Sequence, residues 1–253
     1  MTYPQSMIDD VVRLLGEGRS QAEISRRKGI SRAAIHDWQC GKVPKRAREA
    51  HPPYERDRCP LIATASSPAY AYLLGLYLGD GTISKMAKGV FRLRIFCCDA
   101  YPHLMDLCAE AMTSVLPGHR VGRFPCVGCT DVSSYSKHWP CLFPQCGPGR
   151  KHQRSILLTA WQAAIVREYP KDFVRGLIHS DGCRSINPIR AATGKMYFYP
   201  RYEFTNRSQD IKDLFCSACD LLHVEWKVMN RSTISINKRA DVAFLDTFIG
   251  PKT

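Results

Sequence analysis

Two stretches of this chain decide its fold: residues 72–81 read YLLGLYLGDG, and residues 173–182 read FVRGLIHSDG. Each stretch combines an apolar helical run with small residues four positions apart, and each ends in Asp-Gly. Small residues at that spacing share one helical face and let two backbones approach closely. We therefore expect two helices that pack against each other at the centre of the protein.

The segments after the two stretches follow the same order, as alternating and helical apolar patterns indicate. The first half is predicted to contain a strand over 91–98, a helix over 104–116, a pair of strands within 121–136 and a closing helix. The second half is predicted to contain a strand over 196–206, a helix over 211–222, a pair of strands within 224–238 and a closing helix. Each half also ends on a Gly-Pro signature, at 147–151 and 250–252. The chain is therefore interpreted as a tandem duplication.

The two repeated acids point to a metal site. Asp80 and Asp181 fall in the last turn of each predicted helix, before Gly81 and Gly182, which suit the left-handed position that ends a helix. A helix C-terminus is already partially negative, so two carboxylates placed there side by side repel each other. A hard divalent cation shared with phosphate oxygens, as Mg²⁺ prefers, would offset that repulsion.

These paired motifs resemble those of the LAGLIDADG homing endonucleases, in the single-chain form with two copies, over residues 68–253. The resemblance implies an α+β fold in which an αββαββα half is duplicated about a pseudo-twofold axis. It also implies two saddle-shaped antiparallel sheets over double-stranded DNA, with the motif helices between the halves. The acids would then hold Mg²⁺ or Mn²⁺ at the two scissile phosphates.

The same resemblance assigns roles to individual residues. Asp80 and Asp181 match the catalytic, metal-binding acids, and the residues directly before them, Gly79 and Ser180, are expected to join the metal site. Asn206 matches a residue that positions water, and its counterpart in the first half is interpreted as Cys98. Lys151 and Lys252, in the Gly-Pro signatures, match a basic residue that stabilises transition-state charge. The alternative is that both lysines only contact phosphate.

A separate unit is predicted before the first motif. Residues 7–38 read as three short helices, with Ser20 and Ser31 at helix N-caps and a glycine turn at 28–30. This spacing is typical of a helix-turn-helix, whose second helix lies in the major groove and would present Arg32 and His36 to base edges. The alternative is a three-helix bundle that binds nothing.

These patterns divide the chain into four predicted parts. We expect a helix-turn-helix domain over 1–48, a proline-rich linker over 49–67, a first half over 68–165 and a second half over 166–253. Neither a signal sequence nor a transmembrane run is recognised, so the sequence predicts a cytoplasmic monomer that associates with the nucleoid when bound to DNA.

The charge favours a polyanionic partner. Of the 253 residues, 36 are Lys or Arg and 23 are Asp or Glu, a formal net charge of +13. Alternation in 91–98 places Arg92 and Arg94 on one face of a strand and Leu93 and Ile95 on the other. The residues of the two halves expected near DNA are Arg92, Arg94, Arg120, Arg123, Arg184, Arg190, Lys195, Arg201, Arg231 and Lys238.

The chain also has 12 cysteines, which without a secretion signal are interpreted as reduced thiols or metal ligands. Cys126, Cys129, Cys141 and Cys146, with His138 and His152 nearby, could hold a structural Zn²⁺, although the spacing lacks a second tight pair. Cys216 and Cys219 lie in an amphipathic pattern and are predicted to be core residues.

Taken together, these patterns favour a site-specific DNA endonuclease dependent on a divalent metal. The alternative is a transcriptional regulator that combines the helix-turn-helix with a LAGLIDADG fold and binds DNA without cutting it. An intein is disfavoured because no splicing motifs flank the repeat.

Overall fold

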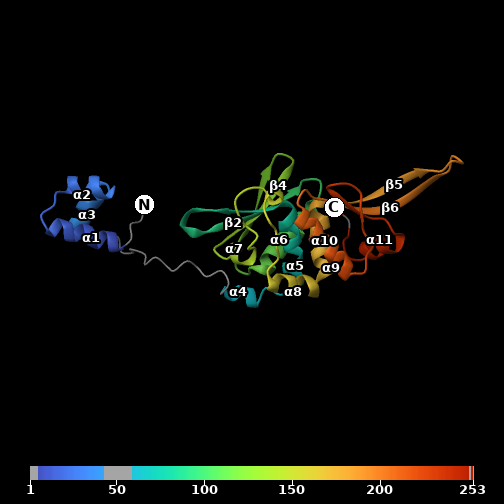
Figure 1. Cartoon of the computed structure of the whole chain (residues 1–253), viewed down its shortest axis with the longest axis horizontal. Helices are drawn as coiled ribbons and strands as arrows, with labels where there is room; N and C mark the ends of the chain where they lie inside the picture. Colours follow the sequence, from blue (N-terminus) through green and yellow to red (C-terminus); the bar gives the residue numbers. More distant parts are fainter. Residues whose placement is uncertain (1–4, 43–58, 251, 253) are drawn as a thin grey trace. The chain divides into compact units, whose positions relative to one another are not determined.

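The computed structural model describes residues 5–42, 59–250 and 252, which form two compact units divided near residue 55 (Figure 1). The end of the predicted N-terminal domain and the linker residues 49–58 lie outside the described residues. None of the described helices is long and apolar enough to cross a membrane.

Within residues 5–42, the first unit contains three helices: α1 (Gln5–Gly16), α2 (Gln21–Lys28) and α3 (Arg32–Gln39). The predicted caps are confirmed, because the Ser20 side chain accepts a hydrogen bond from the Glu23 amide and Ser31 accepts one from the Ala34 amide. Gly29 adopts φ +66°, the left-handed conformation that glycine allows, and so closes α2. Ile35 and Trp38 are buried against α1 residues in a core of this unit's own.

The second unit repeats one order of elements. The first half contains α4 (Pro60–Ala63), α5 (Pro68–Asp80), β1 (Gly81–Lys85), a 3-10 turn (Ala87–Gly89), β2 (Phe91–Cys98), α6 (Pro102–Val115), β3 (Val121–Cys126), β4 (Cys129–Ser136), α7 (Trp139–Leu142), a 3-10 turn (Lys151–Gln153) and α8 (Ala160–Glu168). The second contains α9 (Pro170–Asp181), β5 (Gly182–Arg190), β6 (Met196–Thr205), α10 (Gln209–Leu221), β7 (Lys227–Val228), β8 (Thr233–Ile236) and α11 (Arg239–Asp246).

Each half builds one four-stranded antiparallel sheet, with the orders β1-β2-β4-β3 and β5-β6-β8-β7. The identical strand order confirms the predicted duplication and the α+β class. Helices cover one face of each sheet, and α5 and α9 lie side by side between the halves (Figure 1). Strands β5 and β6 extend from the second half as a two-stranded arm, which is visible in Figure 1.

The linker prediction needs correction at its C-terminal end. Residues 59–67 belong to the second unit, since Cys59 and Ala65 are buried and α4 packs against α7. The prolines of this segment do not leave it unstructured, because Pro60 occupies the first turn of α4, where its missing N–H costs nothing.

The glycines that follow the two motif acids also differ from the expectation. Gly81 and Gly182 have extended backbones and begin β1 and β5 instead of adopting the left-handed conformation. Glycine is required there by space, because a Cβ on Gly81 would lie 2.5 Å from the Tyr77 Cα, and one on Gly182 would lie 2.6 Å from the Ile178 Cδ1. The chain thus turns from helix to strand directly after each acid.

Candidate metal site and nucleic-acid interface

The motif helices α5 and α9 approach each other at the predicted small residues. A Cβ on Gly75 would lie 2.6 Å from the carbonyl oxygen of Phe173, and one on Gly79 would overlap the Ser180 side chain. These positions therefore exclude larger residues, and the close packing of two backbones brings the C-terminal ends of both helices together. Asp80 and Asp181 are the last residues of these helices.

The two carboxylates lie in a partly desolvated and mutually repulsive setting. Burial, followed by repulsion from Asp181, raises the pKa of Asp80 to about 6. Burial also raises the pKa of Asp181, against a hydrogen bond from Asn206 that lowers it. Solvent still reaches both residues, so a cation could enter. Two carboxylates that are costly to ionise together are a donor set that fits a hard divalent cation.

Lys151 and Lys252 lie at this site, one beside each motif helix. The Lys151 ammonium donates to the carbonyls of Leu78 and Gly79, at 3.0 and 2.9 Å, and to that of Tyr77. The Lys252 ammonium donates to the Ser180 carbonyl at 3.2 Å and to that of Gly182. The two lysines therefore cap the helix ends that carry the acids, a role that the sequence analysis did not include.

The surroundings of the two lysines also shift the pKa of each ammonium group. Burial lowers the pKa of Lys151 to about 8, although the charges of Asp181 and Asp80 act in the opposite direction. Burial also lowers the pKa of Lys252. Each ammonium in turn lowers the pKa of both acids, so the four side chains form one electrostatically coupled group.

The residues directly before the acids have partners within the protein. The carbonyl oxygens of Gly79 and Ser180 accept from the lysines, and the Ser180 hydroxyl donates to the Gly176 and Leu177 carbonyls, both at 3.0 Å. The Ser180 side chain is thus directed along its own helix, and the predicted metal ligation by Gly79 and Ser180 has no support in these contacts.

The two halves differ beside the acids. Asn206 donates to the Asp181 carboxylate at 2.6 Å, which fixes one of its oxygens. The sheet register places Cys97, and not the predicted Cys98, at the equivalent position, because Gly81 pairs with Ile95 as Gly182 pairs with Phe204. Cys97 is buried and shares a hydrogen bond with Cys108. No hydrogen bond to the Asp80 carboxylate is found among the described residues.

A cavity of about 420 Å³ opens beside Asp181. Its lining includes Lys151 and Asn206, and also four basic residues to which the sequence analysis gave no role at this site: Arg150, His152, Arg154 and Arg207. Three of these residues could have been found from their positions in the sequence. Arg150 and His152 lie on either side of Lys151, and Arg207 directly follows Asn206. This arrangement surrounds one acid with groups suited to an anionic ligand.

The sheets have an open face, opposite to the face that the helices cover. As predicted, Leu93 and Ile95 are buried under the helices while Arg92 and Arg94 lie on the open face. Both arginines contact the buried Asp131 at 2.8 Å. On the second sheet Arg201 contacts Glu203 at 3.3 Å. These acids fix the guanidinium groups in place and offset part of their charge.

Two predicted DNA contacts lie on the helix-covered side instead. Arg123 pairs in register with Val132 and contacts Asp106 of α6 at 2.6 Å. Arg184 pairs in register with Tyr202 and contacts Asp246 of α11 at 2.7 Å. Both arginines therefore connect a sheet to a helix, and these contacts do not support their expected place near DNA. The remaining predicted contacts are exposed: Arg120, Arg190, Lys195, Arg231 and Lys238, the last paired with Glu225.

In the first unit, Arg32 and His36 are both exposed on α3, while Ile35 and Trp38 face the core. Arg32 and His36 therefore lie on the outer face of α3, away from the core of this unit. Of the predicted zinc ligands in the second unit, His138 and Cys141 lie in one cluster of possible metal ligands, but the full predicted set does not assemble. Cys126 and Cys129 pair across the β3–β4 hairpin, and the cluster that includes Cys141 contains neither of them. Cys216 and Cys219 are buried core residues, as expected.

Comparisons with known proteins give structural matches only. No family model and no curated protein matches the sequence. Variants of the homing endonuclease I-DmoI align with a TM-score of 0.47 at 15% identity, over 74% of this chain and 98% of theirs. The LAGLIDADG meganuclease I-AabMI, bound to uncleaved DNA, aligns with a TM-score of 0.46 at 12% identity, over 71% of this chain and 82% of its own.

A third match is the N-terminal LAGLIDADG domain of DUF199/WhiA, with a TM-score of 0.45 at 11% identity, over 76% of this chain and 88% of its own. The fold of the present chain is defined by its own topology: two halves with the same strand order, joined through two glycine-packed helices that each end in an aspartate.

Proposed function

We propose that this protein is a double-stranded DNA endonuclease that hydrolyses phosphodiester bonds with divalent metal bound at Asp80 and Asp181. The observation that carries the proposal is the meeting of these two acids, one from each half, at the ends of close-packed helices. Twofold-related acids suit the cutting of two strands that are themselves related by a local twofold axis.

The side chains around the acids support this chemistry. When bound, Mg²⁺ or Mn²⁺ would neutralise phosphate charge and activate water. Asn206 holds one oxygen of Asp181 and leaves the other for a cation. Lys151 and Lys252 offset the negative ends of the two helices and favour the ionised form of both acids. Lys151 and Lys252 would therefore keep both carboxylates in the ionised form that binds a cation.

The DNA-binding part of the proposal rests on the open faces of the two sheets. Arg92, Arg94 and Arg201 are held there by Asp131 and Glu203 in fixed orientations, which suits the reading of base edges or phosphates. Exposed lysines and arginines add sequence-independent attraction to DNA. In the first unit, α3 would add base contacts through Arg32 and His36.

The test is cleavage of a randomised duplex library by the full chain with Mg²⁺ or Mn²⁺, followed by sequencing of the cut ends. Asp80→Asn and Asp181→Asn keep the side-chain shape and remove the charge that binds the cation, so cleavage should collapse in each variant. DNA affinity, measured on the selected duplex, should stay or increase slightly because a negative charge is lost beside phosphate. Cleavage by the double variant at the wild-type rate would refute the site.

The second candidate function is a DNA-binding regulator, which the separate three-helix unit favours. This candidate makes the opposite forecast for the wild type: sequence-specific binding without metal-dependent cutting of any duplex in the library. The same experiment therefore separates the two functions.

A further inference from the structure

Three soft metal ligands converge at a place distant in sequence from the motif acids. Cys59 directly precedes α4, His138 directly precedes α7, and Cys141 lies within α7. Both cysteines are buried, with 4% and 3% of their surface exposed, and His138 is half-buried. The ligand atoms of the three residues all lie within 4.8 Å of one another.

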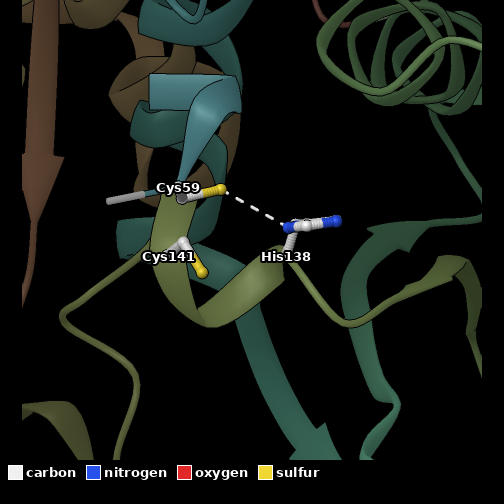
Figure 2. Close-up of side chains that lie close together, drawn as sticks. All are labelled: Cys59, His138 and Cys141. Carbon is white, nitrogen blue, oxygen red and sulfur yellow. Dashed lines mark hydrogen bonds between the residues drawn. The ribbon is translucent and has the colours of Figure 1, made fainter. Parts of the chain in front are cut away.

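The distances between the ligand atoms suit the tetrahedral coordination of one metal ion. Zinc binds thiolate sulfur at about 2.3 Å and imidazole nitrogen at about 2.0–2.1 Å, which in a tetrahedron places sulfur and nitrogen about 3.6 Å apart. Here the Cys59 sulfur lies 3.4 Å from Nδ1 of His138. Figure 2 shows both sulfurs on the side of the ribbon that faces the imidazole. A metal ion would thus require only small movements of these side chains.

We propose that Cys59, His138 and Cys141 bind a zinc ion, with water as the fourth ligand. Two thiolates and one imidazole are soft and borderline donors that select zinc over the hard cations expected at Asp80 and Asp181. The spacing of His138 and Cys141 also fits, because residues three apart at the start of a helix project to the same side. The site is separate in residues and in ligand chemistry from the proposed nuclease site.

The ion would act as a structural cross-link. Cys59 lies at the first described position of the second unit, whereas α7 follows the last strand of the first sheet. Residues 59–63 otherwise join the unit through the packing of the short α4 against α7. A shared zinc ion would fix the start of this unit to its first half and would stabilise the folded form by the binding energy of the metal.

The experiment is a metal analysis of the full-length protein purified from zinc-supplemented medium. We expect about one equivalent of zinc per chain in the wild type and a loss of nearly all of it in Cys59→Ser/Cys141→Ser and in His138→Ala. The matched control is Cys126→Ser/Cys129→Ser, which removes two cysteines of the β3–β4 hairpin and should keep the zinc. Asp80→Asn should also keep it, so failure here and failure of the nuclease proposal are distinguishable.

A second measurement tests the proposed site even if the double variant fails to fold. Cobalt added to metal-free wild type should give thiolate-to-cobalt charge-transfer absorption, and the single variant Cys59→Ser, at the edge of the fold, should weaken that band while its circular dichroism stays native. Absence of zinc together with absence of the cobalt band would overturn the proposal. Equal zinc in Cys59→Ser/Cys141→Ser and wild type would overturn it too, as would a Cys59–Cys141 disulfide in the purified, metal-free chain.

Discussion

The Tyr72 hydroxyl of α5 lies 2.9 Å from Nδ1 of His179 in α9, so a buried hydrogen bond joins the two motif helices. Nε2 of His179 lies 2.8 Å from the carbonyl oxygen of Ile249 and must donate to it. Burial lowers the pKa of His179 and keeps the ring neutral at neutral pH, so Nδ1 is the acceptor for the Tyr72 hydroxyl. The interface between the halves thus depends on an uncharged imidazole.

Acid should weaken this interface. Burial lowers the pKa of His179 to about 4 from an ordinary value of 6.5, so the unfolded chain binds the proton first and stability falls as the pH decreases from 6.5 to 4. The contribution to the unfolding free energy is up to about 3 kcal/mol. Urea denaturation of the wild type and His179→Gln should show a smaller acid-dependent loss in the variant. Tyr72→Phe, the control, should lose about 1 kcal/mol and keep most of the acid dependence of the wild type, because burial is the largest cause of the lowered pKa.

Asp80→Asn should stabilise the metal-free protein at neutral pH. The pKa of Asp80 is raised to about 6, so the folded protein bears a cost for ionising this group that is complete above pH 6 and absent below the ordinary value of 3.8. We expect the melting temperature of the variant to exceed that of the wild type at pH 7 and to equal it near pH 3.5. Equal melting temperatures at pH 7 would contradict the repulsive setting described for the two acids.

Lys151→Met should reduce both cleavage and stability, because the ammonium caps three carbonyls of α5 and favours the ionised acids. Loss of hydrogen bonds from a half-buried charged group such as the Lys151 ammonium costs about 1–3 kcal/mol of unfolding free energy. Cleavage should fall by about tenfold or more and recover partly at higher Mg²⁺. Arg167→Met, which removes an exposed charge on α8 away from the cavity, is the control and should change neither quantity by a comparable amount.

Arg32→Ala should weaken binding to the selected duplex without moving the cut positions, since the acids lie in the other compact unit. Loss of one base contact is worth about 1–3 kcal/mol, or roughly tenfold or more in affinity. Arg13→Ala is the control, because Arg13 already contacts Asp10 and Glu17 on α1. Unchanged affinity of Arg32→Ala across a range of salt concentrations would remove α3 from the DNA interface.

The sequence was sufficient to predict those features that depend on local or repeated patterns. Asp80 and Asp181 were found because the same ten-residue pattern occurs twice, and the helix caps at Ser20 and Ser31 follow from short-range hydrogen bonding.

The sequence was insufficient where strand register or a long-range contact determines the position of a side chain. Arg123 and Arg184 lie on the covered side because side chains alternate from the first residue of a strand, and a shift of one position exchanges the faces. The same one-residue uncertainty exchanged Cys97 for Cys98. The meeting of Cys59 with His138 joins segments 79 positions apart, and no local pattern indicates such a contact.

The difference between Asn206 and Cys97 predicts that the two strands are cut at unequal rates. Asn206 holds the Asp181 carboxylate at 2.6 Å, whereas Cys97 is engaged with Cys108 and leaves Asp80 without that support. Asn206→Ala should therefore slow the strand that depends on Asp181, by about ten- to a hundredfold for a lost hydrogen bond to a charged group, and leave the other strand nearly unchanged.

End-labelling each strand separately would measure both rates, with nicked duplex as the diagnostic intermediate. Asn237→Ala is the matched control, since the Asn237 amide contacts Ser235 and lines no part of the cavity beside Asp181. An equal slowing of both strands by Asn206→Ala would mean that the halves act as one coupled site. No slowing of either strand would show that the hydrogen bond to Asp181 has no part in the reaction.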